Sequence, residues 1–169
     1  LFKASSDFKK AVNCYKKAID IKPNYAMAHN NLGIVFNEFG ELEKAKNCYQ
    51  KAIEINPNYA GAHNNLGNVL RDMGDYRKAI IPYSKAVQIQ PDNAKAHSNL
   101  GILFKDLGEV QDAERCYEKA VSCEPENLIY LYALNDLKNE NVESDFKKKI
   151  EIIMSKKNLS ELNQAYGNF

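Results

Sequence analysis

Apolar and polar positions follow the period of an amphipathic helix along most of the chain, and the whole pattern returns at the fixed interval that separates Pro23 from Pro57. Prolines, glycines, alanines and tyrosines all keep this spacing. The sets are Pro23, Pro57, Pro91 and Pro125; Gly33, Gly67 and Gly101; Gly40, Gly74 and Gly108; Ala45, Ala79 and Ala113; and Tyr15, Tyr49, Tyr83 and Tyr117. A helical pattern with a period of about 34 residues is typical of helix-turn-helix repeats.

Each unit predicts two helices, for example NYAGAHNNLGNVLRDM and then DYRKAIIPYSKAVQIQ, with a glycine between them. Glycine at Gly74 and its equivalents ends the first helix, because it adopts the left-handed conformation without steric cost. The repeat prolines end the second helix. Glycine at Gly67 lies inside the first helix, where it costs about 1 kcal/mol against alanine. We therefore expect a close helix contact there, with Ala79 facing Gly67 and Pro82 kinking the second helix.

The segments NNLGIVFNEFG and KAKNCYQKAIEINPNY, with their two further copies, resemble tetratricopeptide repeats. The resemblance implies an all-α fold, a right-handed superhelical α-solenoid of helix-turn-helix repeats with C-terminal capping helices. The expected units are 1–25, a partial repeat that is mostly a second helix and a turn; 26–59, 60–93 and 94–127, three complete repeats; and 128–169, a degenerate repeat with capping or linker helices. Within the last unit, helices are expected in NLIYLYALNDLK, in SDFKKKIEIIM and from Asn158 onward.

Charge and cysteine content narrow the function classes. With 23 basic and 22 acidic residues the net charge is +1, which gives no electrostatic basis for binding nucleic acid or an anionic membrane. Cys14, Cys48, Cys116 and Cys123 form no CxxC pair and predict a reduced, cytoplasmic setting. No signal peptide or membrane-length apolar stretch is apparent in the sequence.

The sequence carries no motif of a catalytic site, a cofactor or a metal. We find no nucleophile elbow, phosphate-binding loop or HExxH segment, so we predict that the chain is not an enzyme. His29, His63 and His97 share one repeat position, but packed helices lie roughly 8–10 Å apart and zinc needs ligands at about 2 Å. We interpret the three histidines as packing residues.

The best functional signal is a row of amides on the first helices. The resemblance implies that these positions line a concave groove, as in the similar asparagine-lined repeats of O-GlcNAc transferases. An amide both donates and accepts hydrogen bonds, so it can bind the backbone of an extended peptide. The candidate groove residues are Asn30, Asn31, Asn64, Asn65, Asn68, Arg71, Lys95, Ser98, Asn99 and Lys105. The alternative is that the amides connect neighbouring helices and serve structure alone.

A second binding mode in related repeats is the carboxylate clamp that holds the C-terminal tails of chaperones. Asn65 and Lys95 match two clamp positions, but Asn30, Ile34 and Asn99 replace the Lys, Asn and Arg that the clamp needs. Without those cations a terminal carboxylate loses charge-assisted hydrogen bonds worth about 1.5–3 kcal/mol each. We do not expect chaperone-tail binding.

Two functions follow from these observations. The first is a protein-protein interaction scaffold that binds extended peptides, with self-association possible through exposed ends of the array. The alternative is the non-catalytic arm of a larger transferase, because residues 128–169 resemble the segment that joins such repeats to bacterial sulfotransferase domains. Because the chain begins at Leu1, in mid-unit, we expect it to be part of a longer polypeptide.

Overall fold

The computed structural model describes residues 2–138 together with 152, 153 and 155. Its elements are α1 (Phe2–Ile21), α2 (Ala26–Glu38), α3 (Leu42–Ile55), α4 (Ala60–Asp72), α5 (Tyr76–Ile89), α6 (Ala94–Asp106), α7 (Val110–Cys123) and α8 (Leu128–Lys138). Over these residues the chain is all helical, without a strand. The prediction of an all-α helical repeat array is therefore confirmed.

Glycine ends the first helix of each pair, as the sequence predicts. Gly40 has φ +75°, and its N–H donates to the carbonyl of Asn37 at 3.0 Å. The N–H of Glu41 then reaches back to the carbonyl of Phe36 at 2.9 Å. These two bonds satisfy carbonyls that the end of α2 would otherwise leave without donors. Gly74 and Gly108 repeat the turn with φ +81° and +77°.

Proline follows the second helix of each pair by two residues. Helices α3 and α5 end at Ile55 and Ile89, and Pro57 and Pro91 come directly after the next residue. Pro82 lies inside α5, which nevertheless spans 14 residues, as α3 and α7 do. The helix therefore continues across this proline, and the predicted kink stays a prediction.

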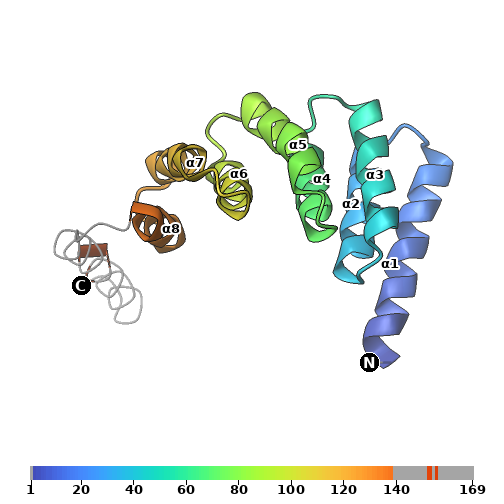
Figure 1. Cartoon of the computed structure of the whole chain (residues 1–169). Coiled ribbons are helices and arrows are strands. Elements are labelled where there is room, and N and C mark those ends of the chain that lie inside the picture. Colours follow the sequence, from blue (N-terminus) through green and yellow to red (C-terminus); the bar gives the residue numbers. More distant parts are fainter. Residues whose placement is uncertain (1, 139–151, 154, 156–169) are drawn as a thin grey trace, which may run out of the picture.

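The helix pairs follow one another along an arc (Figure 1). Helices α4, α6 and α8 lie on the inner side of the arc, and α5 and α7 lie on the outer side. Successive first helices also touch directly, α2 against α4 and α4 against α6. Residues at equivalent positions of these helices thus lie along one continuous surface.

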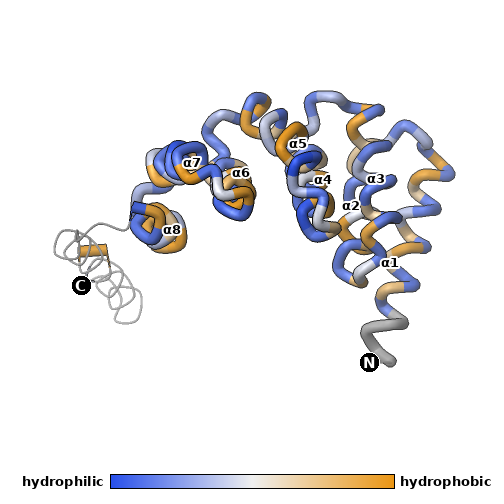
Figure 2. Tube along the Cα trace, viewed as in Figure 1, coloured by the Kyte–Doolittle hydropathy of each residue, from blue (hydrophilic) through white to orange (hydrophobic). Residues whose placement is uncertain are grey.

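The core is made of small and aromatic residues at the repeat positions. Figure 2 shows that each helix carries both hydrophobic and hydrophilic positions. Ala45, Ala79 and Ala113 are completely buried, which lets neighbouring helices approach closely. Tyr49, Tyr83 and Tyr117 fill the space between the two helices of each pair and are at most 2% exposed.

The glycines inside the first helices face tyrosines, and the expectation that alanines face them is wrong. A Cβ atom on Gly67 would lie 2.6 Å from Cδ1 of Tyr83, and one on Gly33 would lie 2.6 Å from Cε1 of Tyr49. At Gly101 the corresponding distance to Cε1 of Tyr117 is 3.0 Å. The aromatic ring takes the volume that a side chain on the glycine would need.

Helix α1 departs from the repeat at its start. The repeat register places the end of a first helix near Phe2, but α1 runs without a break from Phe2 to Ile21. The physical reason is local, because Ser6 stands at the position where the complete repeats have Gly40 and Gly74. Without a glycine the left-handed turn is unfavourable, and the helix continues.

Helix α8 confirms the first helix expected in the tail. It begins at Leu128, one repeat period after the start of α6 at Ala94, and it packs on α7. Leu131 is 5% exposed, and Tyr130 joins Ala94 and Ala120 in a buried cluster. The helices expected in SDFKKKIEIIM and from Asn158 onward lie outside the described residues. No helix in the described part of the chain is long and apolar enough to cross a membrane.

Candidate functional site

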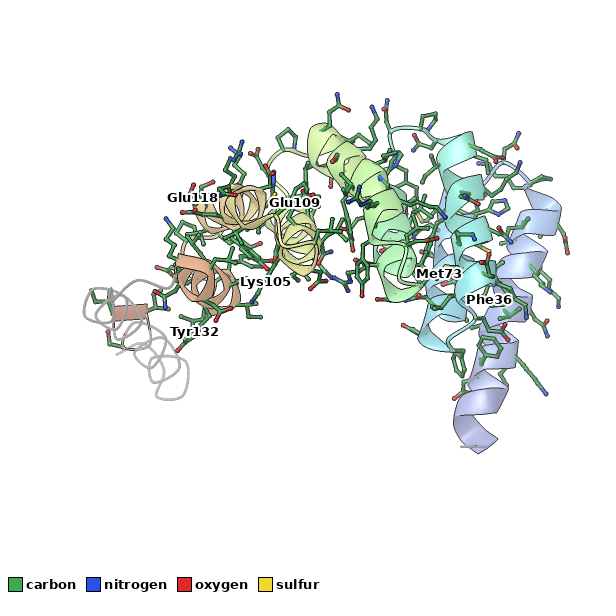
Figure 3. The ribbon with its side chains drawn as sticks, viewed as in Figure 1. Phe36, Met73, Lys105, Glu109, Glu118 and Tyr132 are labelled. Carbon is green, nitrogen blue, oxygen red and sulfur yellow. The ribbon has the colours of Figure 1, made fainter. Side chains whose placement is uncertain are left out.

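The candidate amides lie on the inner surface of the arc. Figure 3 shows Lys105 of α6 and Tyr132 of α8 on the inner side, whereas Glu118 of α7 lies on the outer side. Ser98 and Asn99 precede Lys105 and Asp106 by two helical turns, which places them on the same face of α6. The repeat puts the asparagines of α2 and α4 at equivalent positions. We call this surface the inner amide row.

Hydrogen bonds connect the amides from one repeat to the next. Nδ2 of Asn65 donates to Oδ1 of Asn30 at 3.0 Å, and Nδ2 of Asn30 donates to Oδ1 of Asn31 at 3.3 Å. Nδ2 of Asn99 donates to Oδ1 of Asn64 at 2.9 Å. In both cross-helix bonds, an asparagine at the repeat position of Asn31 contacts the first asparagine of the preceding repeat's pair. The amides therefore join the helices, as the alternative interpretation states.

Burial separates the candidate residues into two groups. Asn30 is 4% exposed and Ser98 is 6% exposed, so both residues lie in the interior of the array. The remaining amides, Asn31, Asn64, Asn65, Asn68 and Asn99, are half-buried. In residues 2–138, Asn65 and Asn99 use only their amino groups in these bonds, which leaves their carbonyl oxygens available as acceptors.

Asn68 is held by a residue of the opposite helix. The hydroxyl of Tyr83 donates to Oδ1 of Asn68 at 2.6 Å. Because Tyr83 also covers Gly67, one ring both fills the gap between α4 and α5 and orients an amide of the inner row. The sequence pattern alone did not predict this bond, although Tyr83 and Gly67 repeat with the same period.

The charged candidates differ in their surroundings. Nζ of Lys105 lies within ion-pair distance of Asp136 of α8, and Arg71 lies 3.6 Å from its neighbour Asp72. Lys95 is exposed at the start of α6. These residues add charges of both signs to the rim of the amide row, so the surface as a whole does not select one charge.

Exposed apolar residues accompany the amides on α2. Met27 is 51% exposed and Ile34 is 36% exposed. They precede and follow Asn30 and Asn31 by three or four residues, which is the spacing of one helix face. Their spacing in the sequence was the signal that would have added them to the candidate surface.

Each of the three histidines forms a hydrogen bond that stabilises the turn between two repeats. Nε2 of His29, His63 and His97 lies 2.9, 2.9 and 2.8 Å from the carbonyl oxygens of Pro23, Pro57 and Pro91, respectively. A carbonyl can only accept, so Nε2 carries the proton and donates. Each histidine thus has a structural hydrogen bond, in agreement with their interpretation as packing residues. No group of three or more His, Cys, Asp or Glu that could hold a metal occurs among the described residues.

Burial shifts the titration of thiols and phenols in the array. It raises the pKa of the Cys48 and Cys116 thiols to about 11, and it raises the pKa of Tyr83 and Tyr117 to about 12. These groups are therefore neutral at physiological pH. A neutral thiol is a poor nucleophile, so Cys48 and Cys116 serve packing.

Comparison with known families identifies the repeat. The model described as TPR repeat matches residues 1–38, 35–74 and 67–108, and the model described as tetratricopeptide repeat matches residues 94–127. Together the matches span residues 1–127, more than half of the chain. The chain belongs to the tetratricopeptide repeat family. Its helix pairs and its inner surface are those of a tetratricopeptide repeat array.

Solved structures agree with this assignment at the level of the fold. The crystal structure of MamA has a TM-score of 0.77 and 21% identity, with 94% of each chain covered. MamA from Desulfovibrio magneticus RS-1 has a TM-score of 0.70 and 22% identity, with 95% of this chain and 88% of that chain covered. YrrB, described as a TPR protein with an unusual peptide-binding site, has a TM-score of 0.70 and 18% identity, with 90% of this chain and 81% of that chain covered. No curated protein sequence matches the chain.

Proposed function

We propose that this tetratricopeptide repeat protein is a non-catalytic scaffold that binds extended segments of partner polypeptides along the inner amide row. The observation that carries the proposal is how the amide side chains are hydrogen-bonded and how far they are exposed. Asn65 and Asn99 are oriented by bonds to the preceding repeat, yet each remains half-buried and keeps a carbonyl acceptor. The structural bonds and the binding role are compatible, because each uses a different part of the amide group.

Orientation of the amides by these hydrogen bonds favours binding. A side chain that is already ordered loses less conformational entropy when it meets a partner. Neighbouring packed helices lie about 8–10 Å apart, which equals about three residues of an extended chain at roughly 3.3 Å each. An extended segment that crosses α2, α4 and α6 therefore presents about one peptide group in three to an amide. Such contacts tolerate many sequences, because every residue except proline has a backbone donor and acceptor.

YrrB supports this proposal as a neighbour in fold, since its structure is described as that of a TPR protein with a peptide-binding site. The alternative of a partner-binding arm in a larger transferase rests on the resemblance of residues 128–169, most of which lie outside the described residues. Under this alternative, too, the inner amide row would bind a segment of a partner polypeptide. The experiment below tests the surface under either alternative.

The test replaces Asn31, Asn65 and Asn99 with alanine and measures binding to a surface-immobilised pool of random 12-residue peptides. We expect the affinity to fall about tenfold or more, because each hydrogen bond to the peptide is worth about 0.5–1.5 kcal/mol. Replacing the exposed amides of Asn13 and Asn47 on the outer helices should leave binding unchanged. Equal binding by the triple variant and the unchanged protein would overturn the proposal.

The triple variant also loses structural bonds, so its stability needs a separate control. Leu131→Ala removes buried apolar volume in α8 without touching an amide and lowers stability by a comparable amount. If Leu131→Ala weakens peptide binding as much as the triple variant does, the amides act only through stability.

A further inference from the structure

The outer surface carries an apolar hollow between the second helices of two successive repeats. Its lining residues are Ile53 of α3, His63 and Leu66 of α4, and Ile80, Ile81, Pro82, Ser84, Lys85 and Gln88 of α5. Its volume is 710 Å³, within the range of about 300–1,000 Å³ that ligand pockets occupy. Ile81 is 76% exposed at its edge.

The sequence of the repeat makes this hollow specific to one place in the array. At the three positions of Ile80, Ile81 and Pro82, the preceding repeat has Lys46, Asn47 and Cys48, and the following repeat has Glu114, Arg115 and Cys116. Helix α1 already has the apolar Val12 at the position of Ile80, but at the position of Ile81 the other second helices have Asn13, Asn47 and Arg115, so an apolar residue stands there only in α5. Because Ile81 is mostly exposed, it contributes little apolar burial to the fold of the array.

The charged residues of α5 also differ from those of α3 and α7. Arg77, Lys78 and Lys85 are its only charged residues, and none is acidic, whereas α3 and α7 each carry residues of both signs. Arg77, Lys78, Ile81, Ser84, Lys85 and Gln88 follow the spacing of one helix face. Of these basic residues, Lys85 lines the hollow, Arg77 lies on the same face of α5, and Lys78 is paired with Asp75 at 3.0 Å.

The lining also limits the conformation of a ligand. Nε2 of His63 already donates to the carbonyl of Pro57, and the remaining polar side chains of the lining are Ser84, Lys85 and Gln88. An extended peptide laid on this surface would therefore leave most of its backbone N–H and C=O groups without protein partners. A helix satisfies its own backbone and needs only apolar contacts, with charges at its edge.

We propose that this outer hollow is a second docking site, which binds an amphipathic helix of another protein that carries apolar residues at helical spacing and acidic residues beside them. The apolar face covers Ile81 and Leu66, and the acidic residues meet Lys85 and Arg77. The site lies on the opposite side of the array from the inner amide row. One copy of the protein can therefore hold an extended segment and a helix at the same time.

The experiment uses two labelled peptides of about 18 residues, one built from Leu, Ala and Glu in an amphipathic pattern and one with Lys in place of every Glu. Fluorescence anisotropy should show binding of the acidic peptide at least tenfold tighter than of the basic one. Ile81→Asn, which installs the residue of the preceding repeat, and Lys85→Glu should each weaken it about tenfold. Ile129→Asn removes a residue that is 73% exposed elsewhere, and Lys119→Glu changes the equivalent lysine of α7; both should leave binding unchanged.

Equal effects of Ile81→Asn and Ile129→Asn would overturn the proposal, as would equal affinity for the acidic and basic peptides. Sedimentation of the protein alone is the second measurement. A dimer that forms without peptide and disappears in Ile81→Asn would show that a second copy of this chain covers the hollow, and it would also overturn the proposal.

Discussion

The side-chain amino group of Asn65 in α4 donates to the side-chain carbonyl of Asn30 in α2 at 3.0 Å, although the two residues are 35 positions apart in the sequence. The contact crosses from one repeat to the next on the inner surface. Asn99 and Asn64 repeat it between α6 and α4 at 2.9 Å. The two bonds couple successive repeats, whose stability in such arrays comes mainly from contacts between neighbours.

Removal of one partner of this bond should destabilise the array. Asn65→Ala leaves the oxygen of Asn30, a residue only 4% exposed, without its donor from the next repeat, at a cost of about 1–3 kcal/mol. Urea denaturation followed by circular dichroism measures this loss. The matched control, Asn47→Ala, changes an exposed asparagine on α3 and should alter the free energy of unfolding by less than about 0.5 kcal/mol. Equal stability of the two variants would show that the bond contributes nothing.

Replacing the glycines of the first helices with alanine should lower the stability of the array by an amount that differs between positions. Gly67→Ala places a Cβ 2.6 Å from the ring of Tyr83, which is completely buried and held by Asn68. Overpacking of this kind costs about 1–3 kcal/mol, which exceeds the gain of about 1 kcal/mol in helix propensity at the upper end of that range. In Gly101→Ala the new Cβ would lie 3.0 Å from Cε1 of Tyr117, so this substitution should destabilise the protein less.

Gly61→Ala provides the control, since Gly61 is exposed on α4 and a Cβ atom on it would lie 3.2 Å from Cε2 of Tyr59. Thermal denaturation should rank the variants as Gly61→Ala, Gly101→Ala and Gly67→Ala in order of falling stability. A Gly67→Ala variant as stable as Gly61→Ala would show that the ring of Tyr83 moves freely, contrary to its close packing against Gly67.

Alkaline pH should destabilise the protein over a defined range. Burial raises the pKa of Cys48 and Cys116 from 9.0 to about 11, and that of Tyr83 and Tyr117 from 10.0 to about 12. The unfolded chain then releases these protons at lower pH than the folded one, so the stabilisation is complete below pH 9 and falls between about pH 9 and 12. Thermal denaturation at several pH values measures this slope, and Tyr117→Phe should reduce the part above pH 10. A melting temperature that stays constant up to pH 12 would contradict it.

Helix α8 should depend on its apolar contacts more than on its ion pairs. Nζ of Lys138 lies 2.9 Å from Glu114 and 3.0 Å from Glu118, but these groups are about one-third to one-half exposed, so Lys138→Ala should cost less than about 1 kcal/mol. Leu131 is 5% exposed, and Leu131→Ala should cost about 2–5 kcal/mol. Urea denaturation of the two variants compares the two effects. A larger loss in Lys138→Ala would contradict this order.

The elements were predictable because each repeat carries its own stop signals. Gly40 and Gly74 lie where α2 and α4 end, and Pro57 follows the end of α3, so one period of the sequence defines a helix pair. The same rule explains the unbroken helix at the start of the chain. Ser6 replaces the glycine of the other repeats, and α1 continues through this position.

Contacts between helices were less predictable, because helical spacing shows which face a residue occupies and not which residue faces it. Gly67 was correctly placed at a close contact, but its partner is Tyr83 and not Ala79. In every complete repeat a tyrosine follows the glycine at the same interval, and the small glycine leaves room for the large ring. This pairing of sizes was the signal in the sequence that indicated the contact. The bond of Asn65 to Asn30 likewise depends on the offset between repeats, which the sequence alone does not provide.

Binding along the inner amide row can be followed at the amides themselves while an extended peptide binds. In ¹H–¹⁵N spectra, the Nδ2 resonances of Asn31, Asn65 and Asn99 should shift on titration with a 12-residue peptide selected from the random pool, because a hydrogen bond to the peptide backbone changes the environment of each amide. Those of Asn13 and Asn47, exposed on α1 and α3, should not move. Replacing backbone amides of the peptide with esters should reduce both the affinity and the shifts. A peptide that binds while the resonances of Asn31, Asn65 and Asn99 stay in place would contradict the claim that the inner amide row is the binding surface.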